Sequence, residues 1–112
     1  MGKHREPLEL LQGTLDVLVL GALVSGPRHG YDVSRWVRER TGGALLIEDA
    51  PLYKALRRLE RAECVLAEWG LSTNNRRARF YRLTAKGRKR LRAEHSTWRR
   101  YAAAVSRVLR PI

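Results

Sequence analysis

Arginine side chains are concentrated in one short segment of the chain. They are Arg76, Arg77, Arg79 and Arg82. The guanidinium group is planar and binds phosphate, or the edge of guanine, through two parallel hydrogen bonds. Residues 1–75 contain ten Lys or Arg and ten Asp or Glu, whereas residues 76–112 contain thirteen Lys or Arg and one acid, Glu94. The formal net charge of +12 therefore lies in the last third of the chain, and this bias favours a polyanionic partner.

A second group of cationic side chains lies on one face of a predicted helix. The segment Glu48–Pro51 has an acidic cap followed by a proline, which is typical of a helix start, and the helix is expected to run to about Ala62. Apolar and cationic residues fall on opposite sides of it, at about 100° per residue. The apolar residues are Leu52, Leu56 and Leu59, and the cations are Lys54, Arg57, Arg58 and Arg61. Tyr53 can donate its hydroxyl to a phosphate. A solvated basic stripe is the alternative interpretation of this face.

The other reactive side chains do not suggest an enzyme. His4, His29 and His95 lack the spacing of metal ligands, and the sequence contains no glycine-rich phosphate loop and no nucleophile beside a base. The single cysteine, Cys64, excludes an internal disulfide and a cysteine-based zinc site, and a buried structural thiol is favoured over a redox sensor. We therefore expect no catalytic residue, no metal and no cofactor.

Nothing in the sequence resembles a membrane span or an export signal. No apolar run approaches about 18 residues, the minimum for a span. Met1–Gly13 is charged and lacks the apolar stretch of a signal peptide. We expect a cytoplasmic protein.

The elements that must position these residues can be predicted from periodicity and turn signals. Apolar residues at helical spacing predict a buried first helix, residues 8–24, before Ser25-Gly26-Pro27. A second helix is expected at 30–40, before Thr41-Gly42-Gly43. Beyond Cys64 the pattern changes to period two on both sides of the turn-rich segment 72–75, which predicts a β-hairpin. Trp36 and Trp69 are expected in the core.

This order of elements is that of a winged helix-turn-helix domain. In such a domain the third helix enters the major groove of duplex DNA while the hairpin, the wing, lies along the backbone. The residues expected to contact DNA are Tyr53, Lys54, Arg57, Arg58, Arg61, Asn74, Asn75, Arg76, Arg77 and Arg79. A non-specific or architectural nucleic-acid-binding protein that uses only the arginine-rich segment is the alternative.

A final helix is expected from Ala85 to Leu109, with Thr84 as its N-cap and Pro111 beyond its end. Six of its residues recur by four and three along one line. They are Leu91, His95, Trp98, Ala102, Val105 and Leu109. One protruding helix cannot bury such a line against so small a domain, so we interpret it as a homodimer interface. Packing on the chain's own first helix is the alternative, and both can occur on different faces. A histidine in this interface could confer pH sensitivity.

The chain also resembles a known family, the PadR family of bacterial transcriptional regulators. Five motifs in the same order carry the resemblance over about residues 8–108. They are Leu11-Gln12-Gly13-Thr14-Leu15-Asp16, His29-Gly30-Tyr31, Leu52-Tyr53, Leu56-Arg57-Arg58-Leu59-Glu60 and Asn74-Asn75-Arg76-Arg77-Ala78-Arg79-Phe80-Tyr81-Arg82-Leu83-Thr84. One departure is Pro51, where the family often has a small residue such as Ser, and another is Lys54, where it often has Pro. Proline has no hydroxyl and no backbone N–H to donate to a phosphate, and Lys54 adds a charge that could replace that contact.

The resemblance implies a mainly α fold with a small β-hairpin. It places a winged helix-turn-helix DNA-binding domain at residues 8–84 and a single C-terminal dimerisation helix at residues 85–109. It further implies a repressor that a small-molecule effector can release, and it makes Trp98 a candidate effector contact. A Trp at an interface is more often an anchor of the dimer.

Overall fold

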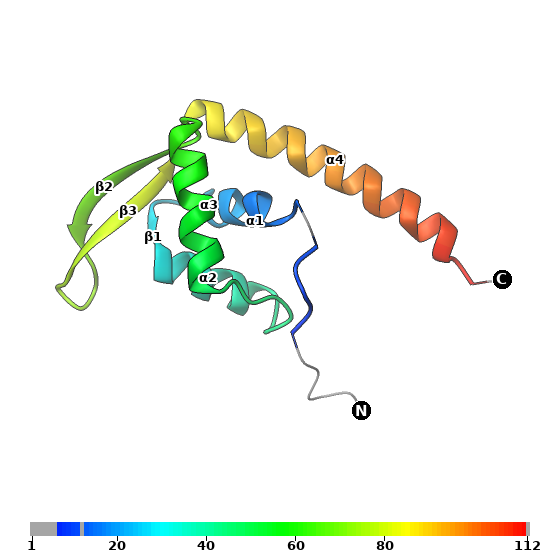
Figure 1. Cartoon of the computed structure of the whole chain (residues 1–112), viewed down its shortest axis with the longest axis horizontal. Helices are drawn as coiled ribbons and strands as arrows, with labels where there is room; N and C mark the ends of the chain where they lie inside the picture. Colours follow the sequence, from blue (N-terminus) through cyan, green and yellow to red (C-terminus); the bar gives the residue numbers. More distant parts are fainter. Residues whose placement is uncertain (1–6, 12, 112) are drawn as a thin grey trace.

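The computed structural model describes residues 7–11 and 13–111. Within them, the elements are α1 Leu15–Ala22, β1 Arg28–His29, α2 Gly30–Arg40, α3 Asp49–Arg61, β2 Val65–Leu71, β3 Arg77–Leu83 and α4 Ala85–Leu109. The helices α1, α2 and α3 pack together, a small three-stranded sheet lies at one side of them, and the fourth helix, α4, extends away from the rest (Figure 1). The sheet is antiparallel, in the order β1-β3-β2. The predicted winged-helix fold with a C-terminal helix is confirmed.

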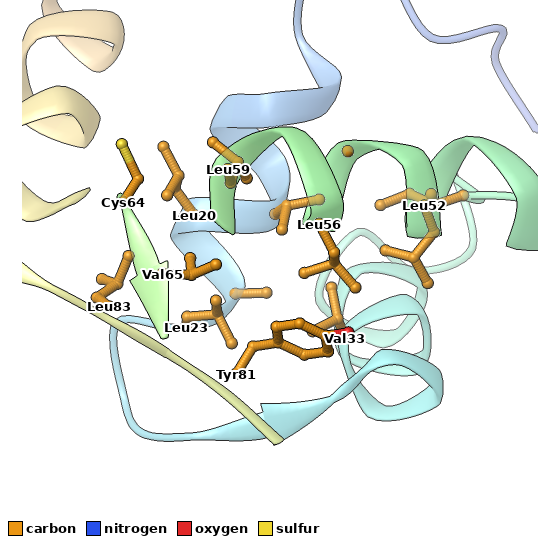
Figure 2. Packing of buried hydrophobic residues seen from close by; sticks show 14 of the residues in the cluster. Leu20, Leu23, Val33, Leu52, Leu56, Leu59, Cys64, Val65, Tyr81 and Leu83 are labelled. Atoms are coloured by element: carbon orange, nitrogen blue, oxygen red, sulfur yellow. The ribbon is translucent and has the colours of Figure 1, made fainter. Parts of the chain in front are cut away.

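One hydrophobic core joins α1, α2, α3 and the base of the hairpin (Figure 2). Leu20 on α1, together with Leu56 and Leu59 on α3, has no exposed surface. Tyr81 and Leu83 of β3 close the core from the side of the sheet. Each fully buried leucine stabilises the fold by about 1.5–3 kcal/mol, so the core fixes the side of α3 that faces solvent.

Side-chain caps set the first residues of α2 and α4. The Asp32 N–H donates to Nδ1 of His29 at 3.1 Å, and the Gly87 N–H donates to the Thr84 hydroxyl at 2.9 Å. Both helices have the predicted bounds because their caps are local in sequence.

The first helix is shorter than the sequence predicts, and a helix that begins at Leu8 is wrong. Gly13 has φ +88°, which no α-helix accommodates, and the helix begins only at Leu15. The Leu8 N–H instead donates to the Ala44 carbonyl at 2.8 Å, and Leu8 pairs with Leu45 in a parallel bridge. Gln12, part of the first family motif, lies outside the described residues.

The wing is a hairpin of two seven-residue strands joined by the five-residue turn 72–76. Val65 pairs with Leu83 at its base, and Leu71 pairs with Arg77 at its tip. Asn75 adopts the left-handed conformation with φ 62°, which asparagine tolerates better than most residues. The pairing of β1 with β3, which the sequence did not predict, adds a third strand.

Trp69 lies outside the core, and its predicted burial is wrong. It is 61% exposed, because β2 and β3 project beyond the helices and both faces of their outer half meet solvent. Trp36, in contrast, packs against the core as expected. Cys64 is a buried free thiol.

Candidate nucleic-acid interface

The exposed face of α3 carries the predicted cationic side chains. Lys54, Arg57 and Arg61 are exposed, while Leu52, Leu56 and Leu59 are buried on the opposite face. The sequence places these two sets on opposite sides of one helix, and the core turns the cationic set toward solvent.

Tyr53 is positioned by Gly30, the first residue of α2. A Cβ at Gly30 would lie 2.5 Å from the Tyr53 hydroxyl oxygen and 2.7 Å from two carbons of its ring. Only glycine therefore leaves room for the ring in this position. The motif His29-Gly30-Tyr31 thus has a physical role, since His29 caps α2 while Gly30 accommodates Tyr53. Tyr53 remains 39% exposed.

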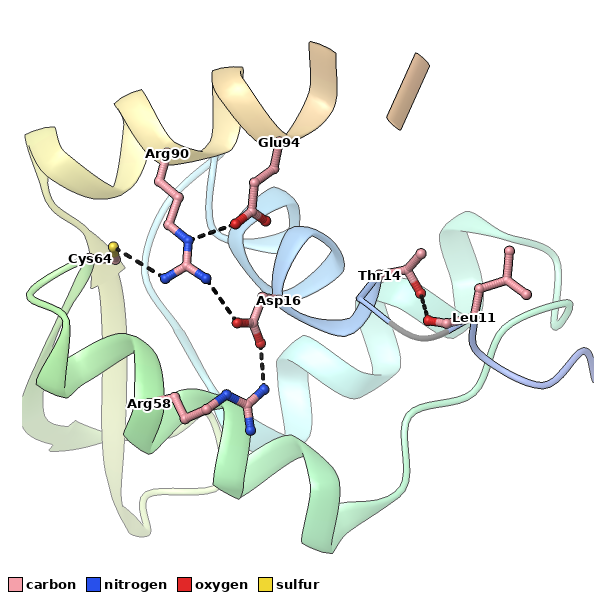
Figure 3. A network of polar contacts seen from close by, with 7 residues as sticks. All are labelled: Leu11, Thr14, Asp16, Arg58, Cys64, Arg90 and Glu94. Atoms are coloured by element: carbon pink, nitrogen blue, oxygen red, sulfur yellow. Dashed lines mark hydrogen bonds and ion pairs between the residues drawn. The ribbon is translucent and has the colours of Figure 1, made fainter. Parts of the chain in front are cut away.

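Arg58 differs from the other cations of α3 because it is paired with Asp16 of α1 (Figure 3). Its Nη2 donates to Oδ1 of Asp16 at 2.6 Å. Nη2 of Arg90, from α4, donates to the second oxygen of the same carboxylate at 3.1 Å. Asp16 therefore joins α1, α3 and α4, a role that the sequence analysis missed. The only signal for it was its place in the first family motif.

Arg90 is held by three partners. Its Nε donates to Glu94 at 2.7 Å, and its Nη1 lies 3.9 Å from the sulfur of Cys64. The hydrogen bond to Glu94 raises the pKa of the Arg90 guanidinium despite partial burial. The start of α4 is further fixed at Gly87, where a Cβ would overlap the carbonyl oxygen of Cys64.

The wing presents its predicted residues in two ways. Asn74, Asn75 and Arg76 are exposed in or beside the turn. Arg79 turns toward α3, where its Nη2 donates to Glu60 at 3.0 Å. Tyr81 lies two residues beyond Arg79 on β3, and burial raises the pKa of its hydroxyl. The wing and α3 are thus joined by an ion pair as well as by the core.

The six residues of the predicted dimer interface do not share one environment. Leu91 packs against the core of its own chain, and Trp98 lines a groove between the start of α1 and α4. His95 belongs to another part of the surface, among Arg92 and Arg99. The other three continue the line toward the end of α4. They are the half-buried Ala102 and Val105 and the exposed Leu109.

The described residues form neither a metal site nor a membrane-spanning helix. No three His, Cys, Asp or Glu side chains between residues 7 and 111, Gln12 aside, gather in a way that could hold a metal ion. In the same part of the chain, no helix has the length and apolar character needed to cross a membrane. His4 lies outside the described residues.

Known proteins share both the sequence pattern and the fold of this chain. Residues 19–93 match the model of the transcriptional regulator PadR-like family. A transcriptional regulator from Clostridium thermocellum is 27% identical, with a TM-score of 0.78 over 86% of this chain and 93% of that chain. A PadR family transcription regulator from Clostridium difficile R20291 is 25% identical, with a TM-score of 0.75 over 87% of this chain and 99% of that one.

A third structure, Bacillus subtilis PadR in complex with operator DNA, shares the fold at 22% identity. Its TM-score is 0.64 over 71% of this chain and 45% of that chain. The family match itself runs from α1 into α4 and includes α3 and the wing. The protein therefore belongs to the PadR-like family of transcriptional regulators.

Proposed function

We propose that this chain is a homodimeric, sequence-specific repressor that binds a pseudo-palindromic operator and is released by a small-molecule effector. The observation that carries the proposal is the exposed face of α3, where Lys54, Arg57 and Arg61 lie beside the arginine-rich wing. A cationic helix face next to a cationic hairpin matches the two grooves and the phosphates of duplex DNA.

The two elements have different roles in this proposal. Lys54, Arg57 and Arg61 on α3 contact base edges or phosphates in the major groove, and Tyr53 donates its hydroxyl to a phosphate. Arg58, which Asp16 already engages, contributes mainly to the position of α3. The wing residues position the protein on the DNA. They are Asn74, Asn75, Arg76, Arg77 and Arg79.

The exposed C-terminal half of α4 supports dimerisation. Val108 is 82% exposed and Leu109 is 73% exposed, an unfavourable situation for apolar side chains at the end of a projecting helix. A second α4 related by two-fold symmetry would cover them together with Ala102 and Val105. The same symmetry would place two α3 helices on successive major grooves.

The groove beside Trp98 supports an effector site. It has a volume of about 430 Å³ and lies between α1 and α4. Its apolar lining includes Leu11, Val17, Trp98 and Tyr101. We propose Trp98, which is 39% exposed, as an anchor of the dimer that can also contact an apolar effector. The repressor acts in the cytoplasm, without a cofactor or catalytic activity.

Titration of DNA fragments at fixed salt tests the proposal. The promoter fragment upstream of the chain's own gene is compared with a random duplex of equal length. A specific regulator binds the promoter more tightly by a factor of about 10³ or more. Equal affinity for the two duplexes, with a steep dependence on salt, would instead identify a non-specific nucleic-acid-binding protein.

A further inference from the structure

The side of α4 that faces away from the rest of the chain is cationic, and the proposed function leaves it unexplained. Arg90 and Glu94 point from α4 toward α1 (Figure 3). Because each residue of a helix advances by about 100°, a second set of residues lies on the opposite side of α4. We call this set, which is exposed throughout, the outer face. It comprises Arg92, Ser96, Arg99, Arg100, Ala103 and Arg107.

No carboxylate offsets the charge of the outer face. Glu94 is the only acid in residues 85–109, and it accepts from Nε of Arg90 at 2.7 Å on the other side of the helix. None of the four arginines of the outer face forms an ion pair with a described residue. Four such guanidinium groups on one helix face create a positive potential that attracts anions.

Two hollows open between the arginines of the outer face, because the residues between them are small. One has a volume of about 390 Å³ and lies beside Ser96, with Arg92 and Arg99 in its lining. The other has a volume of about 530 Å³ and lies beside Ala103, with Arg107 in its lining. A phosphate in either hollow can accept charge-assisted hydrogen bonds from the guanidinium groups, and the Ser96 hydroxyl can donate as well.

The outer face fits an extended chain of phosphates better than it fits a folded protein. It has no apolar side chain larger than alanine, whereas a protein interface is anchored by large side chains in an apolar centre. From Arg92 to Arg107 it is about 23 Å long, at about 1.5 Å per residue. Over that length one strand of B-DNA presents about seven phosphates, and the guanidinium fork matches their oxygens. A single phosphate or nucleotide would fill only one of the two hollows.

We propose that the outer face of α4 binds the phosphate backbone of a second DNA duplex, so that the repressor joins two segments of DNA. The proposal rests on the proposed function for the first segment, which α3 and the wing bind, and it goes beyond that function. Asp16 lies between α3 and α4, and the outer face lies on the far side of α4 from Asp16 (Figure 3). The outer face therefore needs a different duplex from the one on α3. Other segments of the same DNA molecule are present at a high effective concentration beside a bound operator.

Two variants of equal charge test the proposal. Arg99→Gln/Arg100→Gln removes two cations from the outer face, and Arg38→Gln/Arg40→Gln, the matched control, removes two from the exposed end of α2. A promoter duplex is immobilised in excess over the protein, so that every α3 is occupied, and the retention of a fluorescein-labelled random duplex is measured. The unaltered chain and the control are expected to retain this duplex, and Arg99→Gln/Arg100→Gln to retain about tenfold less. Equal retention by the two variants would overturn the proposal.

The salt dependence of this retention counts the phosphate contacts of the outer face. Each lost contact lowers the slope of log affinity against log salt by about one. Arg99→Gln/Arg100→Gln is therefore expected to lower the slope by about two, while the control leaves it unchanged. The same slope for Arg99→Gln/Arg100→Gln and the unaltered chain would contradict a phosphate contact. Polyglutamate that displaces the labelled duplex more readily than unlabelled duplex does, at equal charge concentration, would assign the outer face to an acidic protein instead.

Affinity for the promoter duplex alone separates this proposal from the proposed function. The unaltered chain and both variants are expected to bind that duplex alike in anisotropy titrations, because α3 and the wing are unchanged. A loss of promoter affinity in Arg99→Gln/Arg100→Gln that equals its loss of retention would show that one duplex contacts both surfaces, and would overturn the second duplex. Equal affinity of the unaltered chain for promoter and random duplexes would overturn the proposed function. Retention on an immobilised random duplex would then still decide on the outer face.

Discussion

The carboxylate of Asp16 accepts a hydrogen bond from the guanidinium of Arg58 at 2.6 Å, and this contact joins the first helix to the helix that we propose reads DNA. The other oxygen of the carboxylate accepts from Arg90 of α4. Because the Asp16 side chain is only 17% exposed, water does not readily take the place of its carboxylate as the partner of Arg58 and Arg90. The orientation of α3 therefore depends on a charge network as well as on the core.

Asp16→Asn is expected to lower the free energy of unfolding by about 1–3 kcal/mol, since it leaves two guanidinium groups beside each other without the carboxylate between them. Urea denaturation measures this loss. Glu39→Gln is the control, because it removes an exposed carboxylate from α2 that makes no ion pair with any described residue. Equal stability of the two variants would show that the network does not hold α3.

Arg57 and Arg58 are neighbours on α3 with different expected roles. Arg57→Ala is expected to weaken binding to the promoter by about 1–3 kcal/mol and to relax sequence preference if Arg57 reads a base. Arg58→Ala is expected to lower the free energy of unfolding, because it breaks the pair with Asp16. Binding titrations and urea denaturation of both variants separate the roles. A uniform loss over all sequences for Arg57→Ala would assign it to a phosphate.

Gly30→Ala is expected to weaken DNA binding, because the added methyl group displaces the Tyr53 ring. The nearest atoms to that methyl group all belong to the partly exposed Tyr53 side chain, so the fold itself loses little. Gly21→Ala on α1 is the matched control, since a Cβ there has no neighbour within 4 Å. Anisotropy titrations with the promoter duplex compare the two. Unchanged affinity for Gly30→Ala would remove Tyr53 from the interface.

Asp32 makes stability depend on pH in the acid range. Burial raises the pKa of its carboxyl, but Arg35 and Arg28 outweigh burial and hold the pKa below its ordinary value of 3.8. Its contribution is therefore present above about pH 4 and is lost as the pH falls through the lowered pKa. Asp32→Asn should destabilise the fold by about 1 kcal/mol near pH 7 and progressively less below pH 4. Thermal unfolding of the unaltered chain and of Asp32→Asn at several pH values measures the difference in stability between them. A difference that stays constant down to pH 2 would contradict the role of the Asp32 carboxylate.

Trp98→Ala is expected to weaken the dimer, because it removes the largest apolar side chain from the middle of α4. Light scattering on dilution measures the molecular mass. Arg100→Ala, also exposed on α4, is the control and should leave the mass unchanged. A mass that Trp98→Ala does not alter would count against the proposed interface.

Local signals allowed most of the fold to be predicted from the sequence. The bounds of α2 and α4 follow from caps and breakers within a few residues of each end, such as Thr84 and the pair Gly42-Gly43. The start of α1 could not be predicted in this way. The spacing of Leu8 and Leu11 is helical, but Leu8 pairs with Leu45, a residue far along the chain.

The candidate site was predictable only in part, for a similar reason. The spacing of apolar and cationic residues predicts which face of α3 is buried and which is exposed. It does not predict which acidic side chain pairs with each cation. Asp16 lies 42 residues from Arg58 and 74 residues from Arg90, and no pattern in the sequence joins them. The alternation of side chains along β2 predicts a buried Trp69, but it does not reveal that the hairpin extends beyond the hydrophobic core.

Hydroxyl-radical footprinting of the DNA upstream of the chain's own gene tests the central claim most directly. A homodimer that places two α3 helices on successive major grooves should protect two symmetric half-sites about one helical turn apart, with the wings covering the minor grooves beside them. Uniform protection without boundaries, or a single half-site at saturation, would contradict a sequence-specific, homodimeric regulator.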